Sequence, residues 1–319
     1  GAVIPINQMQ LKVVKIRGIE SSGMLCSEYE LGISDAHDGI IQMPEDSNVG
    51  ALYVDQMNLN NVIIEIGITP NRQDCLGVHG IARDLAAAGM GELKNIEIPK
   101  IKTNGTSPIN ILFEEKADEK NYCPAFGSRY IKNVKNCESP QWLKDKLNSI
   151  GLKPISALVD ITNYILFDFN RPLHVYDADK VSGNIIIRSA KKDEKFLGLD
   201  DKEYTLDKGM CVIADEKKPL GLGGILGGSS SACDMATTNV LLESALFIPS
   251  NIANTGRKLF IDSDARYRFE RGVDPNSLNV GLDRAASLIQ EICGGEISET
   301  QICGTVIKSE QDISFDLVK

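Results

Sequence analysis

The stretch Gly221–Glu243 contains the densest group of residues that could build a binding site. Its glycines crowd into eight positions and are interleaved with large apolar residues: Gly221, Gly223, Gly224, Gly227 and Gly228. Glycine is favoured where φ must be positive or where another group approaches the backbone closely. A glycine cluster among apolar residues therefore predicts a pocket wall made of main chain.

A single carboxylate follows these glycines at the end of an apolar run. Val240–Leu242 predicts a buried strand, and Glu243 comes directly after it. A carboxylate buried there is costly unless it has a partner or a ligand. Two interpretations stay open from these residues alone: a ligand pocket, or a glycine-rich turn before a strand that ends in an exposed glutamate. A P-loop is excluded because no Gly-Lys-Ser/Thr follows, and the spacing of a dinucleotide fingerprint is absent.

Histidine and cysteine, which often bind metals or act as nucleophiles, are few or scattered. The three histidines are His37, His79 and His174, and the eight cysteines form no Cys-x-x-Cys pair. Cys75 and His79 are four residues apart and would share a helix face, but no second pair accompanies them. We therefore predict packing there rather than a metal site. His174 follows the sequence RPL at an expected junction between a regular element and a loop, where structural and catalytic roles both stay open.

Length and composition are those of an ordinary globular chain. The 319 residues are 42% apolar and 24% charged, which allows a sizeable core and about two or three domains. The net charge of −10 argues against a generally basic nucleic-acid surface. Local phosphate contacts are best sought in the basic segment between Arg129 and Lys153. Scattered cysteines without a signal peptide predict a cytoplasmic protein, and no apolar run reaches membrane-spanning length.

The glycine stretch and Glu243 lie among short strands and helices. Strands are expected at Val62–Ile68, Ser128–Val134, Ile185–Ile187, Lys202–Leu206 and Met210–Ala214. Helices are expected from Asp74 to Gly89, from Ser139 to Gly151 and from Asp274 to Gly294, because each range has a capping residue at its start and a glycine at its end. The polar, proline-containing stretch 95–120 predicts a domain boundary. The mixture of elements indicates an α+β protein.

Several long stretches occur in the order found in bacterial phenylalanyl-tRNA synthetase beta subunits, which the chain resembles. They are TPNRQDCLGVHGIARDLAAAG, LVDITNYILFDFNRPLHVYDADK, LGLDDKEYTL, LGGILGGSSSACDMATTNVLLESALF and DARYRFERGVDP. The opening, GAVIPINQMQLKVVKIRGIESSGMLCSEYELGI, resembles the second half of that subunit's tRNA-binding OB-fold domain. Together these stretches span nearly the whole chain.

The resemblance implies an α+β fold in which a partial OB-fold β-barrel and a small helical and β unit precede an α+β editing domain. The family's subunit is much longer than this chain, which therefore looks like an internal piece. The expected divisions are 1–57, the C-terminal part of the OB-fold tRNA-binding domain; 58–95, a small α+β segment that packs on the rest of the core; 96–111, a linker; 112–293, the editing domain; and 294–319, the start of a truncated next domain.

The activity implied by the resemblance is hydrolysis of tRNA(Phe) mischarged with tyrosine, within a ligase that charges tRNA(Phe) with phenylalanine. A pocket for phenylalanine rejects an added hydroxyl by only ~10²-fold, whereas a site that hydrogen-bonds the hydroxyl rejects the analogue lacking it by ~10⁴-fold or more. The whole synthetase would use ATP and Mg²⁺ and would join an alpha subunit in a heterotetramer. This chain itself is expected to hold no cofactor, and no membrane partner is expected.

The family's editing pocket can be carried over residue by residue. Glu243 would accept a hydrogen bond from the tyrosine phenol, and Gly223 and Gly224 would form the backbone wall against the ring. The other positions would hold the ester end and a water, or would close the pocket: Thr162, Asn163 and His174 for the first role, Ser263 and Ala265 for the second. No metal ligands are among them, so attack of water on a positioned ester is the expected chemistry.

Two segments depart from the family's usual pattern. RPLHVYD stands where QPMHAFD is usual, and SDARYRFE stands where TDASHRFE is usual. Ser263 keeps the hydroxyl of the usual threonine. Arg266-Tyr267 replaces a smaller pair and removes a histidine, which leaves the role of that corner open.

Two other classes of function stand as alternatives to an editing site. One is a non-catalytic RNA-binding and assembly scaffold of the synthetase. The other is a free-standing α+β protein that binds a small ligand. The glycine wall and Glu243 favour the editing site, while the net acidity weakens RNA binding by this chain alone.

Overall fold

The chain divides into two compact units, Gly1–Val62 and Ile63–Lys319. The computed structural model describes residues 1–57, 59–60, 62–95, 98, 100–114, 122–306 and 314. Parts of the expected linker 96–111 and of the expected last segment 294–319 therefore lie outside the described residues. Each unit is described by itself.

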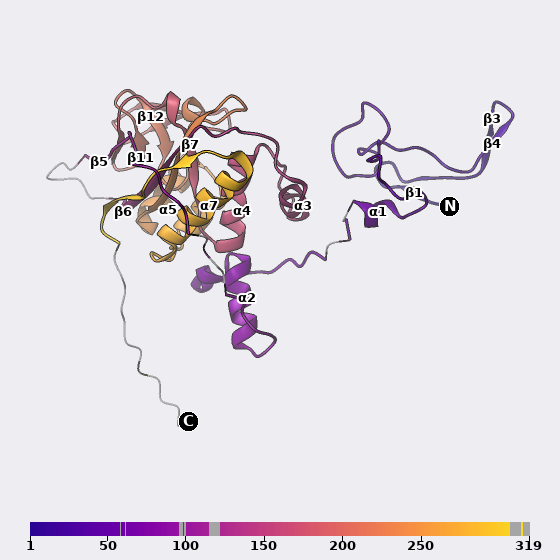
Figure 1. Ribbon diagram of the computed structural model, residues 1–319, viewed down its shortest axis with the longest axis horizontal. Helices are drawn as coiled ribbons and strands as arrows, with labels where there is room; N and C mark the ends of the chain where they lie inside the picture. The colour runs from indigo at the N-terminus through magenta and orange to yellow at the C-terminus, as the bar shows by residue number, and fades with distance from the viewer. Residues whose placement is uncertain are drawn as a thin grey trace. The chain divides into compact units, whose positions relative to one another are not determined.

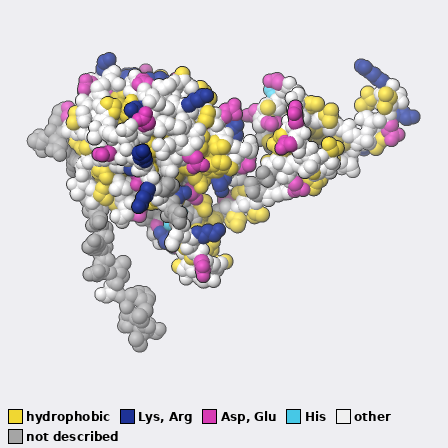
Figure 2. Space-filling model, in the orientation of Figure 1, with side chains coloured by type: hydrophobic (Ala, Val, Ile, Leu, Met, Phe, Trp, Pro, Cys, Tyr) yellow, Lys and Arg dark blue, Asp and Glu magenta, His cyan; other side chains and the backbone are white. Residues whose placement is uncertain are grey.

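The first unit consists of short hairpins and turns (Figure 1). Strand β1 (Val3–Ile4) pairs with β2 (Met9–Gln10), β3 (Val14–Ile16) pairs with β4 (Ile19–Ser21), and α1 covers Tyr53–Gln56. Many apolar side chains of this unit reach the surface, as Figure 2 shows, and Ile19 is 76% exposed. The described strands form two separate pairs and no closed barrel, so the OB-fold expected for 1–57 stays a prediction.

The second unit is built around an antiparallel sheet that is covered on both faces. Its strand order is β15-β6-β14-β7, with β16 also paired to β6. The strands are β6 (Ala125–Lys132), β7 (His174–Asp177), β14 (Asn239–Leu246), β15 (Glu296–Ile297) and β16 (Gln301–Gly304). We call it the central sheet. Helices α3 (Gln141–Ser149), α4 (Ala157–Phe169) and α7 (Ser277–Cys293) supply one of the two cores that it borders.

A second sheet supplies much of the other core. Its order is β13-β12-β11-β8-β5, with β5 parallel to β8 and the other neighbours antiparallel. The strands are β5 (Ile111–Phe113), β8 (Ile185–Ser189), β11 (Cys211–Ala214), β12 (Pro219–Leu222) and β13 (Leu226–Gly227). A separate hairpin joins β9 (Glu194–Leu197) to β10 (Glu203–Leu206).

The central strand β14 explains why a glutamate within it is unusual. Successive side chains of a strand point to opposite faces. Accordingly, Leu241 and Ala245 belong to the core that includes the second sheet, while Val240 and Leu242 belong to the core that includes the helices. Glu243 shares the face of Leu241 and Ala245. A strand buried on both faces therefore carries one carboxylate toward the inter-sheet core.

Local sequence signals account for the helices that cover the sheet. Buried residues of α7 recur at helical spacing, as at Leu278, Leu282, Ala285 and Ile289, and the helix ends at Gly294 with φ of 71°. Helix α4 ends at Asn170, which is left-handed with φ of 55°. The other helical elements described in this unit are η1 (Pro70–Cys75), α2 (Val78–Ala87), η2 (Ala178–Lys180), η3 (Ser229–Ser231), α5 (Pro249–Leu259) and α6 (Asp264–Phe269).

Four sequence expectations differ from these elements. The helix expected from Asp74 to Gly89 is interrupted, because η1 ends at Cys75 and α2 begins at Val78, so Cys75 and His79 do not share one helix face. Val62–Ile68 forms no strand, and Ile64 is 74% exposed, because an alternating segment gains nothing from extension without a partner strand. Residues 296–304 contribute β15 and β16 to the central sheet, so the expected division at 293/294 falls inside that sheet. The range 96–111 is not wholly a linker, since Thr103 bridges to Ile297 and Ile111 begins β5.

No helix in the described part of the chain has the length and apolar character needed to cross a bilayer.

Candidate functional site: a cavity beside Glu243

A small cavity of about 80 Å³ lies in the second unit, bordered by residues of both sheets. Its walls come from β7, β12, the turn between β12 and β13, β14 and α6. The residues expected to form a binding site that do line it are His174, Gly223, Gly224, Glu243 and Ala265. The structure therefore brings together residues from segments up to 91 positions apart in the sequence.

Backbone forms one wall of the cavity. Gly224 has φ of +68°, which favours glycine. A Cβ at Gly223 would lie 2.8 Å from Cε1 of Phe247, and one at Gly224 would lie 2.7 Å from Cδ2 of the same ring. At Gly227 a Cβ would collide with the His174 imidazole. These glycines are thus required by close packing, as the sequence pattern predicted.

Glu243 is buried in this cavity wall, with 7% of its surface exposed. Its Oε2 accepts a hydrogen bond from the Tyr176 hydroxyl. Burial raises the pKa of Glu243 to about 7, against the lowering effects of the Tyr176 hydrogen bond and the Arg171 charge. A carboxyl group poised near neutrality can change its charge over the physiological range.

His174 lies directly opposite Glu243, on β7. Its ring meets the Tyr176 ring edge-on at 4.5 Å between centroids. The Nε2 atom is buried and has no hydrogen-bond partner among the described residues. Burial lowers the pKa of His174 to about 4, so the imidazole is neutral at pH 7. A neutral imidazole donates a hydrogen bond from one ring nitrogen and accepts one at the other.

His174 and Glu243 belong to a row of polar residues that lie opposite one another across the central sheet. Ser128 on β6 is opposite Glu243, and Gln301 on β16 is opposite Ser128. Ser128 is fully buried, and neither its Oγ nor Oε1 of Gln301 has a partner in the described structure. Cross-strand neighbours stand about 5 Å apart at Cβ. One cross-strand row of the central sheet thus carries His174, Glu243, Ser128 and Gln301.

Arg171 places a positive charge next to this row. It is completely buried, and its Nε donates to Ser244 Oγ at 2.9 Å. Burial lowers the pKa of Arg171 to about 10, while Asp274 and Glu243 oppose that change. Sequence reasoning missed Arg171, Tyr176 and Ser128. The alternation of Phe126, Ser128 and Tyr130 is a local signal that places Ser128 on an inward face.

Thr162 and Asn163 are not among the residues that line the cavity. Both lie on α4, and Thr162 Oγ1 donates to the Val159 carbonyl one turn back at 2.7 Å. Such back-bonding satisfies a helical hydroxyl locally. Their expected role at the ester end therefore stays a prediction, with no cavity contact to support it.

Ser263 connects α6 to the glycine wall without lining the cavity. Its hydroxyl accepts from the Arg266 backbone N–H at 3.1 Å, which caps the helix, and donates to the Ile225 carbonyl at 2.6 Å. Ala265, in the first turn of α6, reaches the cavity. In the same corner, Arg266 is tied to Glu270 at 3.1 Å. Arg271 stacks on the Tyr267 ring at 3.6 Å. Arg266 and Tyr267 thus each have a partner in the residues that follow α6.

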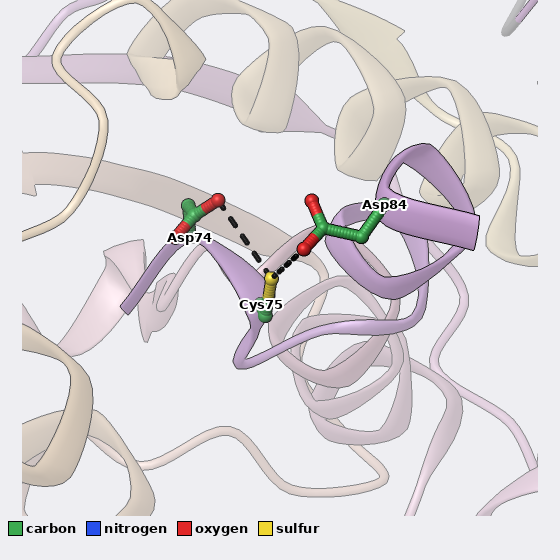
Figure 3. Close-up of side chains that lie close together, drawn as sticks. All are labelled: Asp74, Cys75 and Asp84. Carbon is green, nitrogen blue, oxygen red and sulfur yellow. Dashed lines mark hydrogen bonds between the residues drawn. The ribbon is translucent and has the colours of Figure 1, made fainter. Parts of the chain in front are cut away.

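One group of possible metal ligands lies elsewhere in the unit. Figure 3 shows that Asp74, Cys75 and Asp84 converge, and Cys75 Sγ donates to Asp84 at 3.5 Å. Arg72 forms ion pairs with both carboxylates, and so does Arg83. The Arg72 hydrogen bond lowers the pKa of Asp74 to about 2. The two guanidinium groups balance the two carboxylates, so the cluster has the charge of an ion-pair network.

Comparison with known proteins provides matches for both parts of the chain. Residues 122–294 match the family model described as "B3/4 domain", and residues 1–52 match the one described as "Putative tRNA binding domain". The chain is 50% identical over 319 residues to the phenylalanine–tRNA ligase beta subunit of Rhodopseudomonas palustris, of which it covers 39%. It is 51% identical over 317 residues to that of Nitrobacter winogradskyi, of which it covers 38%. The chain thus spans about two fifths of the length of these relatives.

A solved structure is also similar, at a low level. It is an N-terminal fragment of the phenylalanyl-tRNA synthetase beta subunit from Pyrococcus horikoshii, with 17% identity and a TM-score of 0.41. The likeness covers 72% of this chain and 60% of that one.

Proposed function

The chain belongs to the B3/4 domain family, and from that premise we propose that the cavity beside Glu243 is an editing site for a mischarged aminoacyl-tRNA. The ester hydrolysed would be that of tyrosine on tRNA(Phe), within a phenylalanine–tRNA ligase. The observation that carries the proposal is Glu243 itself: a buried carboxylate, beside a backbone wall, with Oε2 taken and Oε1 without a partner among the described residues.

The carboxylate supplies the discrimination that the editing reaction needs. Ionised Glu243 accepts hydrogen bonds only, so its free oxygen matches a phenol O–H and has no counterpart on phenylalanine. A hydrogen bond to a charged group contributes ~1.5–3 kcal/mol, which corresponds to roughly 10- to 100-fold in selectivity. The flat glycine wall allows an aromatic ring to lie against main chain.

The size of the cavity limits how the amino acid enters. At about 80 Å³ it is smaller than the ~150 Å³ apolar cavity that binds benzene. Full entry of a phenol ring therefore requires the walls to move outward. The glycine turn is the part of the wall with least side chain to displace.

His174 is placed to act on the other end of the substrate. Its neutral imidazole borders the same cavity, and the buried Nε2 has no protein partner in the described residues. In the proposal this nitrogen positions the attacking water or the ester oxygen. The chemistry is then general-base or positional assistance of hydrolysis.

The wider assembly is proposed from the relatives. The match of residues 1–52 to a tRNA-binding model supports contact with tRNA(Phe). Relatives named as beta subunits support an alpha-subunit partner, ATP and Mg²⁺ use by the whole ligase, and a cytoplasmic location. A scaffold role without editing is the competing proposal, since a tRNA-binding segment alone would serve it.

The test is deacylation by the assembled ligase that contains this chain. Pre-formed Tyr-tRNA(Phe) and Phe-tRNA(Phe) are incubated with the enzyme, and the loss of each ester is followed. The editing proposal predicts rapid loss of the tyrosyl ester alone. Equal, uncatalysed decay of both esters would leave the scaffold role.

A further inference from the structure

The hydrogen bond between Tyr176 and Glu243 uses an internal phenol in the place where a substrate phenol is proposed to bind. Tyr176 is 1% exposed and belongs to the inter-sheet core. Its hydroxyl donates to Glu243 Oε2. Glu243 Oε1 has no hydrogen-bond partner in the described structure, and the residue lines the cavity. Among the described residues, one of the two carboxylate oxygens of Glu243 is thus hydrogen-bonded within the protein itself, and the other is not.

The packing around Tyr176 fixes where its hydroxyl lies. The ring contacts the His174 ring edge-on at 4.5 Å. On another side β12 borders the hydroxyl, since a Cβ built at Gly221 would stand at an ordinary van der Waals distance of 3.6 Å from Oη. Only 1% of the Tyr176 surface is exposed, so its neighbours enclose the whole side chain. A side chain held this closely by its neighbours keeps one rotamer. Tyr176 therefore presents its donor at a fixed point beside the carboxylate.

A fixed donor restricts the glutamate in turn. The terminal torsion of a glutamate is broad, so an isolated carboxylate would sample several orientations in the cavity. A hydrogen bond to Oε2 removes that freedom and leaves Oε1 in one position. The conformational entropy of the Glu243 side chain is then lost when the protein folds, and not when the ligand binds.

We propose that Tyr176 is a specificity-determining positioning residue, which holds Glu243 so that one carboxylate oxygen is satisfied internally and the other accepts a substrate phenol. The inference rests on the proposed editing function. Tyr176 would then contribute to the recognition of tyrosine by contacting the Glu243 carboxylate, without touching the substrate. It also makes Tyr176 one of the groups that keep Glu243 ionised.

The charged and titratable groups around Glu243 support the effect of Tyr176 on the ionisation of this carboxyl group. Burial raises the pKa of both Cys123 and Cys211, so these thiols are neutral, as is His174. Arg171 and Tyr176 are the groups that lower the pKa of Glu243 among the described residues. Removing the Tyr176 hydroxyl should therefore shift the titration of Glu243 to higher pH.

The first measurement is the titration of Glu243 in this chain, by NMR of ¹³C-labelled glutamate carboxyl groups. Glu243→Gln identifies the signal. In wild type its midpoint should lie near 7, and in Tyr176→Phe it should rise by about one to two pH units, the equivalent of one charge-assisted hydrogen bond. Tyr204→Phe is the matched control, because the Tyr204 hydroxyl also donates to a carboxylate, Asp200, at 2.6 Å.

The second measurement is binding of tyrosinamide and phenylalaninamide at pH 8 to the same variants. The wild type should prefer tyrosinamide. Tyr176→Phe should lower that preference about tenfold and leave phenylalaninamide binding unchanged, while Tyr204→Phe should preserve the preference. Incorporation of 3-fluorotyrosine at position 176 serves as a second variant that keeps the ring. Its stronger donor should move the Glu243 midpoint downward.

The outcomes separate the inference from the function on which it rests. An unchanged Glu243 midpoint in folded Tyr176→Phe and in the fluorotyrosine protein would overturn the inference. So would an undiminished preference for tyrosinamide. If neither amide binds wild type at this cavity, the proposed function fails, and the titration alone then decides whether Tyr176 positions the carboxylate.

Discussion

Glu243 and His174 face each other across β14 and β7, and burial moves their pKa values in opposite directions. The pKa of Glu243 is raised from 4.5 to about 7, and that of His174 is lowered from 6.5 to about 4. Both shifts favour the uncharged forms. Two neutral side chains therefore share the inter-sheet cavity in mildly acidic solution. Raising the pH through about 7 ionises Glu243, whereas lowering it through about 4 protonates His174.

This relationship predicts opposing pH dependences of stability. The raised pKa of Glu243 means that its stabilising contribution is lost as pH rises from about 4.5 to about 7, because the folded state holds a proton that the unfolded state has released. The lowered pKa of His174 means that its contribution is lost as pH falls from about 6.5 to about 4. Each of these two pKa shifts corresponds to a change of about 3 kcal/mol in the free energy of unfolding. In wild type the two slopes partly cancel.

Glu243→Gln should reveal the pH dependence of stability that His174 causes. Between pH 6.5 and 4.5 the unfolding free energy of the variant should fall more steeply on acidification than that of wild type, which urea unfolding at a series of pH values measures. The matched control is Glu203→Gln, since Glu203 is an exposed strand glutamate. Parallel curves for wild type and Glu243→Gln would show that Glu243 ionises normally in the folded protein.

The backbone wall should not tolerate side chains. Gly224→Ala places a Cβ at positive φ and 2.7 Å from the Phe247 ring, which should lower stability by about 1–3 kcal/mol. Gly91→Ala is the control, because a Cβ there meets nothing within 4 Å. Thermal or urea unfolding distinguishes the two. Equal stability of both variants would mean that the turn is looser than its contacts indicate.

His174 should affect the rate of hydrolysis and not the choice of amino acid. His174→Ala removes a neutral imidazole from the cavity and leaves Glu243 in place. Deacylation of Tyr-tRNA(Phe) by the assembled ligase should slow by roughly 10²-fold, with the ratio of tyrosyl to phenylalanyl ester loss retained. A variant that hydrolysed both esters equally would reassign His174 to amino-acid recognition.

Editing should not depend on a metal held by this chain. The convergent ligands Asp74, Cys75 and Asp84 are already paired with Arg72 and Arg83. Prolonged chelation, followed by restoring only the Mg²⁺ that tRNA folding needs, should leave deacylation of pre-formed Tyr-tRNA(Phe) intact. Recovery that required added Zn²⁺ would contradict the water-attack chemistry.

The parts of the site that sequence reasoning could predict are those with local signals. The glycine cluster and the carboxylate after an apolar run are contiguous patterns, and the structure places both at the cavity. The Tyr176–Glu243 hydrogen bond and the row from His174 to Gln301 depend on the register of strands far apart in the chain. No local pattern determines that register.

Misplaced expectations have physical causes of the same kind. Val62–Ile68 alternates like a strand, but strand formation requires a partner that the sequence does not reveal. Strand β15 has two residues, too few for a periodic signal. The expected role of Thr162 stays a prediction, and in α4 its hydroxyl is bonded to the helix backbone.

The most direct test of the account is the ratio of Tyr-tRNA(Phe) to Phe-tRNA(Phe) deacylation rates in Glu243→Ala. The variant is assembled into the ligase, with Glu203→Ala as the control for an exposed glutamate. Loss of the carboxylate should reduce the ratio by roughly 10- to 100-fold, while phenylalanine activation stays normal. A folded Glu243→Ala enzyme with an unchanged ratio would contradict the assignment of this cavity to tyrosine recognition.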